Sequence, residues 1–291
     1  MNSTDITHTA LSPSPSPSQP QGPSAPGPVA VVTGASRGLG LELARALAAD
    51  GWQLVITARN PVELAAAEAL LRPLTTVLAL PGSVVDDDHR AELAGAADRL
   101  GGAALLVNNA STLTGYDLEG AAPPTLAGFP LPGLLETFEV NVLAPIALTQ
   151  LLLPQLRMHG GSVINLSSDA AVEAYAGWGG YGASKAALDH ASAVLALEEA
   201  QVRVWAVDPG DMRTRMHQEA FPGEDISDRP LPGTVVPAFR TLLRERPASG
   251  RYRAADLSAV PEAVAESVPE ALPRTVPEAG SVIAAAASDG R

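Results

Sequence analysis

Short runs of apolar and β-branched residues alternate along the chain with longer stretches in which apolar residues recur at helical spacing. The short runs predict parallel strands, because a sheet that is covered on both faces needs strands that are apolar throughout. We expect these strands at residues 29–33, 53–57, 76–80, 104–108, 162–166 and 202–207. We expect the helices between them at residues 39–50, 61–71, 86–100, 134–158 and 181–200.

This regular exchange of strand and helix predicts right-handed βαβ units. The expected fold class is α/β, with a Rossmann-type doubly wound parallel sheet, helices on both faces and a single domain. Sheets of this kind bind their ligands at the carboxyl ends of the strands. The loops that follow the strands are therefore the place to look for chemistry.

Both ends of the chain depart from the pattern. Residues 1–28 are rich in proline and serine and lack lysine and arginine, which predicts a disordered arm and disfavours a secretory signal. Residues 255–291 form an acidic low-complexity stretch in which Val-Pro-Glu recurs at 260, 268 and 276. That stretch is either a solvated tail or a short interaction repeat. The folded domain is expected at residues 29–254.

Composition narrows the possible partners. The chain has no cysteine, five histidines and a formal net charge of -13. The lack of cysteine excludes disulfides and thiolate chemistry and suits a reducing cytoplasm, and the scattered histidines predict no metal site. The negative charge argues against a nucleic acid or an anionic membrane surface as partner, and no apolar run approaches the roughly 20 residues that span a bilayer. We therefore expect a cytoplasmic protein.

Lys185 is the only lysine among 19 lysine and arginine residues, and it follows Tyr181 by four positions. On a helix these two side chains lie on one face. A nearby cation favours phenolate and would lower the tyrosine pKa from its usual value of about 10, which makes a tyrosine useful for proton transfer. The spacing is common in helices, and a bias against lysine could also leave one survivor by chance.

A glycine-rich turn, Thr33-Gly34-Ala35-Ser36-Arg37-Gly38-Leu39-Gly40, joins the first strand to the first helix. Glycine permits a tight turn and a close approach of the backbone, and a helix N-terminus offers N–H groups and a positive dipole to a pyrophosphate. Such a turn is either structural or part of a dinucleotide site. Its place between a strand and a helix favours the dinucleotide site.

Six segments of the chain, in order, resemble the short-chain dehydrogenase/reductase family. Residues 33–40 match the family's T-G-x-x-x-G-x-G, Asn108-Asn109-Ala110 matches its N-N-A-G, and residues 181–185 match its Y-x-x-x-K. Ser168 stands where the family has its catalytic serine, Asn141 matches its catalytic asparagine, and residues 209–214 match P-G-x-x-x-T. The chain departs from the family at Ser111, which replaces the last glycine of N-N-A-G, at Ser83 and at Asp208, where aspartate and asparagine respectively are common.

The resemblance implies hydride transfer between C4 of a nicotinamide and a carbonyl carbon. It makes Tyr181 the proton donor or acceptor, Lys185 the group that holds the nicotinamide ribose, and Ser168 a donor to the reacting oxygen. It also implies that Asn141 positions a water for a proton relay to Lys185. Two local alternatives stay open, since Ser168 could simply bond backbone at a strand end and Asn141 could satisfy a helix irregularity.

The site residues implied by the resemblance fall into two groups. The catalytic residues are Asn141, Ser168, Tyr181 and Lys185, and the cofactor-binding residues are Thr33, Gly34, Ser36, Arg37, Gly38, Leu39, Gly40, Arg59, Asn109, Ala110, Tyr181, Lys185, Pro209, Gly210 and Thr214.

Charge after the second strand bears on the choice of cofactor. An NAD-preferring protein would carry an acid there to bind the adenosine ribose, but this chain has Ala58. Arg59 beside it and Arg37 in the glycine turn could hold a 2'-phosphate from two sides. We expect NADP(H) rather than NAD(H). The alternative is that either arginine is a solvated loop residue.

The expected substrate is a small carbonyl or alcohol compound, but the sequence does not identify it. Residues 211–232 fill the family's variable substrate loop, and their soft apolar side chains could line an apolar site or pack within the loop. The candidates on the two sides are Met212, Met216, His217, Phe221, Tyr175 and Trp178. By resemblance, a homodimer or homotetramer would form through the long helices after the fourth and fifth strands. Two other classes stay open: a non-catalytic NAD(P)-binding regulatory protein and an interaction protein that uses its tails.

Overall fold

The computed structural model describes residues 26–113 and 124–258. The predicted arm at residues 1–28 and the predicted tail at residues 255–291 therefore lie almost entirely outside the described residues, as do the three Val-Pro-Glu repeats.

Seven parallel strands form one sheet in the order β3-β2-β1-β4-β5-β6-β7. Their bounds are β1 (Val29–Thr33), β2 (Gln53–Ala58), β3 (Val77–Pro81), β4 (Ala103–Asn108), β5 (Ser162–Leu166), β6 (Arg203–Asp208) and β7 (Gly250–Arg253). The strand order reverses between β1 and β4, which opens a crevice at the carboxyl ends of these strands. The predicted fold class, a doubly wound parallel sheet of the Rossmann type, is confirmed.

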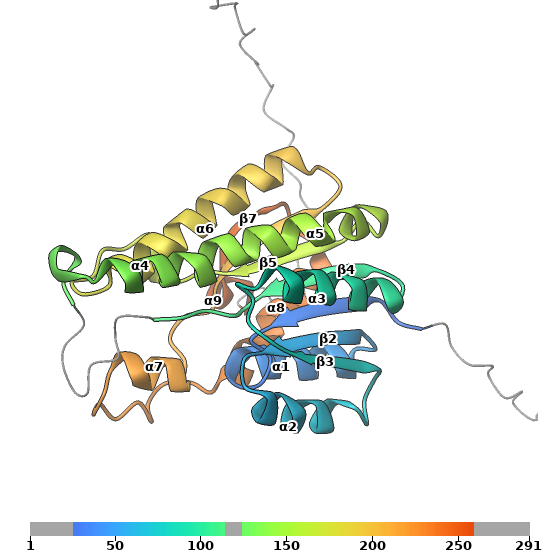
Figure 1. Cartoon of the computed structure of the whole chain (residues 1–291), viewed down its shortest axis with the longest axis horizontal. Helices are drawn as coiled ribbons and strands as arrows, with labels where there is room; N and C mark the ends of the chain where they lie inside the picture. Colours follow the sequence, from blue (N-terminus) through green and yellow to red (C-terminus); the bar gives the residue numbers. More distant parts are fainter. Residues whose placement is uncertain (1–25, 114–123, 259–291) are drawn as a thin grey trace, which may run out of the picture. The chain divides into compact units, whose positions relative to one another are not determined.

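Helices cover both faces of the sheet (Figure 1). One face carries α3 (Asp87–Arg99), α5 (Ala144–Met158) and α6 (Gly179–Glu198). The other face carries α1 (Gly38–Ala49), α2 (Pro61–Leu71) and α8 (Val236–Glu245). The arrangement explains why apolar runs, and not alternating patterns, marked the strands.

Strand β1 illustrates how the two cores are built. Val29 and Val31 point into the core shared with α3 and α5, and Ala30 and Val32 point into the core shared with α1 and α8. Successive strand side chains face opposite sides, so a strand between two helical layers must be apolar at every position.

The helix expected at residues 134–158 begins earlier and is interrupted. It consists of α4 (Leu131–Phe138), a π-helical turn η2 (Glu139–Leu143) and α5. By length and composition the stretch from 131 to 158 could cross a membrane, but Leu148, Leu152 and Leu156 pack in the core beneath it. Packing against the sheet therefore accounts for the buried part of its apolar surface.

The chain beyond β6 contains elements that the sequence did not predict. They are α7 (Arg215–Ala220), η4 (Pro232–Val235), α8, β7 and α9 (Ala254–Ser258). Strand β7 reads Gly-Arg-Tyr-Arg, and a short edge strand with charged residues lacks the apolar run that marks a buried strand. It pairs with β6 and brings Arg251 beside the carboxyl ends of the central strands.

Candidate active site

The glycine turn between β1 and α1 has the backbone geometry that its sequence suggests. Gly34 and Gly38 adopt positive φ angles of 65° and 57°, a region that favours glycine. A Cβ on Gly40 would lie 2.3 Å from the Gly34 carbonyl oxygen, so α1 begins in close contact with the turn. The N-terminus of α1 thus lies at the mouth of the crevice, with its first N–H groups available for an anion.

Thr33 and Asn109 fasten the ends of β1 and β4 to each other. The Thr33 hydroxyl accepts hydrogen bonds from the backbone N–H groups of Asn109 and Ala110, both at 3.0 Å. The Asn109 amide donates to the carbonyls of Thr33 and Gly34 at 3.0 and 3.1 Å. These bonds fix the crevice at the strand-order reversal, and together with the glycine turn they fit a dinucleotide cofactor.

A cleft of about 1090 Å³ opens along this edge of the sheet. Such a volume exceeds that of a typical drug-sized ligand site and suits a cofactor together with a substrate. The predicted site residues on its walls are Gly34, Ser36, Arg37, Gly38, Leu39, Arg59, Asn109, Ala110, Ser168, Tyr181, Lys185, Pro209, Gly210 and Thr214. The remaining three, Thr33, Gly40 and Asn141, do not line the cleft and support it from behind.

Tyr181 and Lys185 lie together on the first turns of α6. The Lys185 ammonium is 5.5 Å from the centre of the Tyr181 ring and donates a hydrogen bond to the Leu166 carbonyl at 2.7 Å. Both side chains are buried. Burial lowers the pKa of Lys185 to about 8, and the charge of Asp189 opposes this shift.

The tyrosine pKa corrects the sequence-based expectation that Lys185 makes the phenol acidic. Burial is the largest influence and raises the pKa of Tyr181 above its ordinary value, and the charges of Asp169 and Asp208 raise it further. Hydrogen bonds with the Ser111 and Ser168 hydroxyls act in the opposite direction. In the protein alone the phenol is therefore protonated at neutral pH.

Ser168 follows β5 and faces the same cleft. Its hydroxyl donates to a carboxylate oxygen of Asp169 at 2.9 Å and accepts from the Ala170 N–H at 3.2 Å. The residue thus also begins the short helix η3 (Asp169–Ala171), which is the local role weighed against catalysis. The hydroxyl has a single proton, so it must turn from Asp169 toward the cleft before it can donate to a substrate oxygen.

Asn141 lies within the π-helical turn η2 and is fully buried. Its amide oxygen accepts from the Ser111 hydroxyl at 3.0 Å and from the Thr112 N–H at 2.9 Å. Its amide nitrogen donates to the Thr112 carbonyl at 3.1 Å and to the Ser184 hydroxyl at 3.0 Å. The protein thus occupies both ends of the side chain, and a water held by this residue would have to bind its main chain.

The part of the cleft beside Arg37 and Arg59 contains an acid that was not among the predicted site residues. Glu63 of α2 accepts a hydrogen bond from Arg37 at 2.6 Å and lies 3.7 Å from Arg215 of α7. The sequence signal was its third position in a helix capped by Asn60, a place where an acid usually serves the helix itself. Arg37 is therefore already paired, whereas Arg59 lines the cleft with no ion pair among the described residues.

Aromatic side chains also line the cleft, next to Tyr181. The Trp178 ring meets Tyr181 edge to face, with 5.7 Å between centroids, and lies 5.6 Å from Phe221. The His217 ring lies tilted against the Phe221 ring, with 4.9 Å between their centroids. The six residues that the sequence offered as a substrate lining all lie on the cleft wall. Some of them also pack against one another, so lining the cleft and packing within the loop do not exclude each other.

Comparison with known proteins agrees with this geometry. The sequence model of the short chain dehydrogenase family matches residues 28–225. An uncharacterized oxidoreductase of Mycobacterium tuberculosis is 36% identical over 191 residues, which are 64% of this chain and 70% of that protein. The L-fucose dehydrogenase of Oryctolagus cuniculus is 33% identical over 195 residues, which are 66% of this chain and 65% of that protein.

Solved structures show the same fold. An alcohol dehydrogenase of Thermococcus sibiricus complexed with 5-hydroxy-NADP superposes with a TM-score of 0.69 at 26% identity, covering 78% of this chain and 95% of that one. A short chain dehydrogenase of Escherichia coli complexed with NADPH gives a TM-score of 0.69 at 27% identity, covering 78% and 96%. From the family match and the architecture of the cleft, the chain belongs to the short-chain dehydrogenase family of oxidoreductases.

Proposed function

We propose that the protein interconverts a carbonyl compound and an alcohol with NADP(H) as the hydride carrier. The observation that carries the proposal is the meeting of Ser168, Tyr181 and Lys185 on the walls of the cleft that also contains the glycine turn. A nucleotide-binding protein without catalysis would need the turn but not the three polar side chains.

The residues divide the chemistry among them. The bound nicotinamide supplies or accepts the hydride. Tyr181 gives its proton to the oxygen of the reduced carbonyl, and the Ser168 hydroxyl donates a hydrogen bond to the same oxygen, where charge develops in the transition state. Lys185 holds the nicotinamide ribose.

Protonation favours reduction at neutral pH. Since burial raises the pKa of Tyr181, the phenol carries the proton that a carbonyl oxygen needs. Alcohol oxidation requires the phenolate and should therefore increase toward alkaline pH.

The preference for NADP(H) rests on the positive charge at the adenosine end. Arg59 faces the cleft, and Ala58 leaves room where an acid would select NAD(H). The structures of relatives bound to 5-hydroxy-NADP and NADPH support this choice. Glu63 opposes it, because its carboxylate engages Arg37 and would repel a 2'-phosphate.

The proposal is tested with a panel of aldehydes, ketones and alcohols, followed by nicotinamide absorbance with phosphorylated and unphosphorylated cofactors. We expect turnover with a higher kcat/KM for NADP(H). The Arg59→Asp variant should lower the ratio of the two kcat/KM values about tenfold or more, the value of one charge-assisted contact. An unchanged ratio would mean that Arg59 does not determine the cofactor preference. Cofactor binding without turnover across the panel would favour a regulatory protein.

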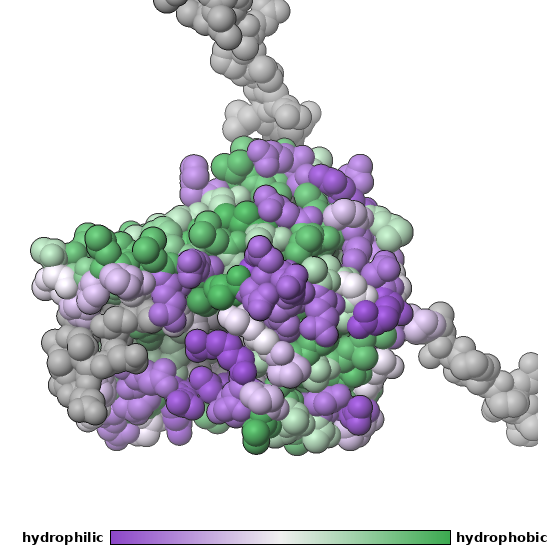
Figure 2. All heavy atoms as spheres, in the orientation of Figure 1, coloured by the Kyte–Doolittle hydropathy of each residue, from purple (hydrophilic) through white to green (hydrophobic). Residues whose placement is uncertain are grey.

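We further infer a homodimer or homotetramer formed through α5 and α6. Apolar side chains gather on the surface over α4 and α5 (Figure 2). Exposed apolar residues on α4, on the turn η2 and on α5 and α6 are Leu131, Leu135, Leu143, Leu151, Met158, Val194 and Leu197. Large exposed apolar patches mark association surfaces. We retain a cytoplasmic location and a catalytic domain at residues 29–254 as further parts of the proposal.

A further inference from the structure

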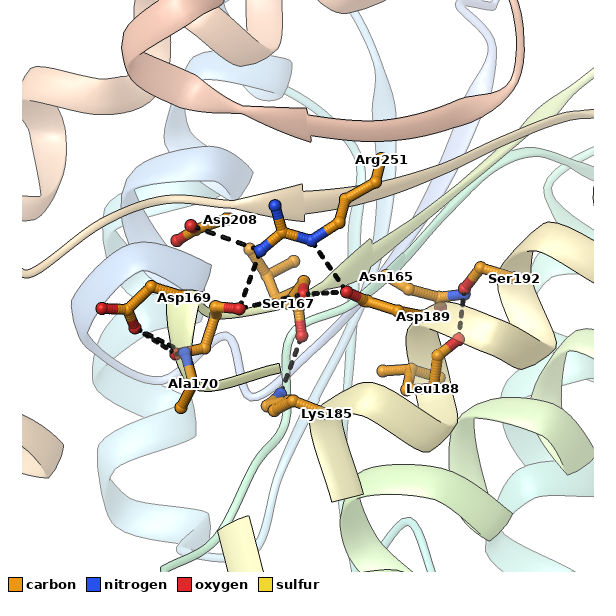
Figure 3. A network of polar contacts seen from close by, with 12 residues as sticks. Asn165, Ser167, Asp169, Ala170, Lys185, Leu188, Asp189, Ser192, Asp208 and Arg251 are labelled. Carbon is orange, nitrogen blue, oxygen red and sulfur yellow. Dashed lines mark hydrogen bonds and ion pairs between the residues drawn. The ribbon is translucent and has the colours of Figure 1, made fainter. Parts of the chain in front are cut away.

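Arg251, on the edge strand β7, directs its guanidinium toward three groups behind the catalytic residues (Figure 3). It donates to the Asp189 carboxylate at 2.9 Å and to the Ser168 carbonyl at 2.8 Å. It also lies 3.5 Å from the Asp208 carboxylate. One planar cation thus joins the segment after β5, the middle of α6 and the end of β6, a geometry that a lysine could not reproduce.

Each of these contacts leads to the catalytic centre. Ser168 is itself the proposed donor to the substrate oxygen. Asp189 lies one helical turn after Lys185. Its Oδ2 atom, which accepts the hydrogen bond from Arg251, also accepts one from the Ser167 hydroxyl at 2.8 Å. Asp208 accepts the backbone N–H of Gly210 at 3.0 Å and so positions the loop that begins with Pro209.

The buried carboxylates of Asp189 and Asp208 are compensated by the positive charge of Arg251. The side chains of Asp208 and Asp189 are only 4% and 13% exposed, and an uncompensated buried carboxylate is strongly destabilising. Asp208 is the more deeply buried of the two carboxylates. Arg251 is the cation in contact with it.

We propose that Arg251 is a positioning residue of the catalytic centre, which holds Ser168 and Asp189 in place and compensates for the charge of Asp208. The inference rests on the proposed oxidoreductase function, because that function gives Ser168 and Lys185 their roles in the reaction.

The electrostatic consequences have a definite sign. Asp189 raises the pKa of Lys185, and Asp208 and Asp169 raise the pKa of Tyr181. Removing the positive charge of Arg251 strengthens the effect of Asp189 on the Lys185 pKa and the effect of Asp208 on the Tyr181 pKa. The titrating and charged groups that bear on the pair from the surrounding elements are Asp169 of η3, Asp189 of α6, Asp208 of β6 and Arg251 of β7.

Four variants of the full chain test the inference. Arg251→Gln removes the cation, Arg251→Lys keeps the charge without the fork, and the double variant Asp208→Asn/Arg251→Gln removes the acid together with its partner. Arg240→Gln is the matched control, because Arg240 pairs with Asp50 through two hydrogen bonds on the exposed surface between α8 and α1.

Two measurements are made on each variant. The first is the pH profile of kcat/KM with a carbonyl substrate that the wild type reduces. The second is the NMR titration of the lysine side chain in protein labelled with ¹³C at lysine Cε, which gives one signal because Lys185 is the only lysine.

We expect Arg251→Gln to lower kcat/KM at neutral pH by about tenfold to a hundredfold and to move the profile and the Lys185 titration to higher pH. The double variant should recover part of both shifts. Arg251→Lys should keep the wild-type profile with a lower kcat, and Arg240→Gln should match the wild type.

Several results would overturn the inference. They are an unmoved profile and titration in Arg251→Gln, wild-type kcat in Arg251→Lys, or no recovery in the double variant. If the wild type turned over no carbonyl compound, the proposed function would fail, yet the lysine titration would still decide whether Arg251 acts on the catalytic pair.

Discussion

Lys185 combines burial with charge, and this combination has a measurable effect on stability. Its folded-state pKa of about 8 lies below its ordinary value of 10.5, so between these values the unfolded chain binds the extra proton. Wild-type stability should therefore rise with pH across this window, by at most about 3 kcal/mol. In Lys185→Met this contribution is absent, and the free energy of unfolding from urea titrations should rise less steeply between pH 8 and 10. If the free energy of unfolding changed with pH equally in the two proteins, Lys185 would not have a lowered pKa in the folded protein.

Glu63 provides a second test at a single side chain. Replacing it by glutamine frees Arg37 for a 2'-phosphate and removes a repulsive charge, so the ratio of kcat/KM for NADPH over NADH should rise about threefold to tenfold. Glu68→Gln is the control, because Glu68 pairs with Arg72 on the same helix and does not line the cleft. A ratio that moves equally in both variants would mean that Glu63 acts only through overall charge.

Among the elements, the glycine turn is the most sensitive to a small change. Gly40→Ala would place a methyl group 2.3 Å from the Gly34 carbonyl and 2.4 Å from the Asn109 amide. We expect a loss of about 1–3 kcal/mol in stability and weaker NADPH binding, because α1 must move from the turn. Gly95→Ala in α3 is the matched control, since its nearest neighbour would be 3.7 Å away. That change should stabilise the helix by about 0.5–1 kcal/mol, and equal losses in both variants would argue against a packed turn.

Most elements up to β6 could be predicted from the sequence, because a strand between two helical layers is apolar at every position, as Val29 to Val32 show. The π-helical turn around Asn141 could not, since its sequence is compatible with an ordinary helix. Strand β7 was not predicted because Gly-Arg-Tyr-Arg contains no apolar run, yet Arg251 turns inward.

The candidate site shows the same division between pattern and context. The residues of the glycine turn, and the pair Tyr181 and Lys185, stand at fixed spacings within short segments, so they can be recognised in the sequence. The pairing of Arg37 with Glu63 and the burial that raises the Tyr181 pKa depend on segments distant in sequence. Such electrostatic effects could be obtained only from the three-dimensional structure.

For the whole molecule, association through the α4–α5 surface is the property to test. Leu151→Glu places a charge on the exposed apolar face and should reduce the mass measured by light scattering after size exclusion. Leu70→Glu is the control, because Leu70 is an exposed leucine on α2, on the other side of the sheet. A wild-type mass for Leu151→Glu, or an equal reduction in both variants, would place the interface elsewhere or remove it.

In the proposed reaction Tyr181 transfers a proton during hydride exchange with a nicotinamide cofactor, and replacing its hydroxyl removes that proton. NADPH oxidation with a reducible carbonyl substrate is measured for the wild type and Tyr181→Phe, with NADPH fluorescence confirming that both bind the cofactor. We expect turnover by the wild type and a kcat lower by about 10²–10⁴-fold in the variant, the usual contribution of a positioned proton donor. Equal rates for the two proteins would contradict it.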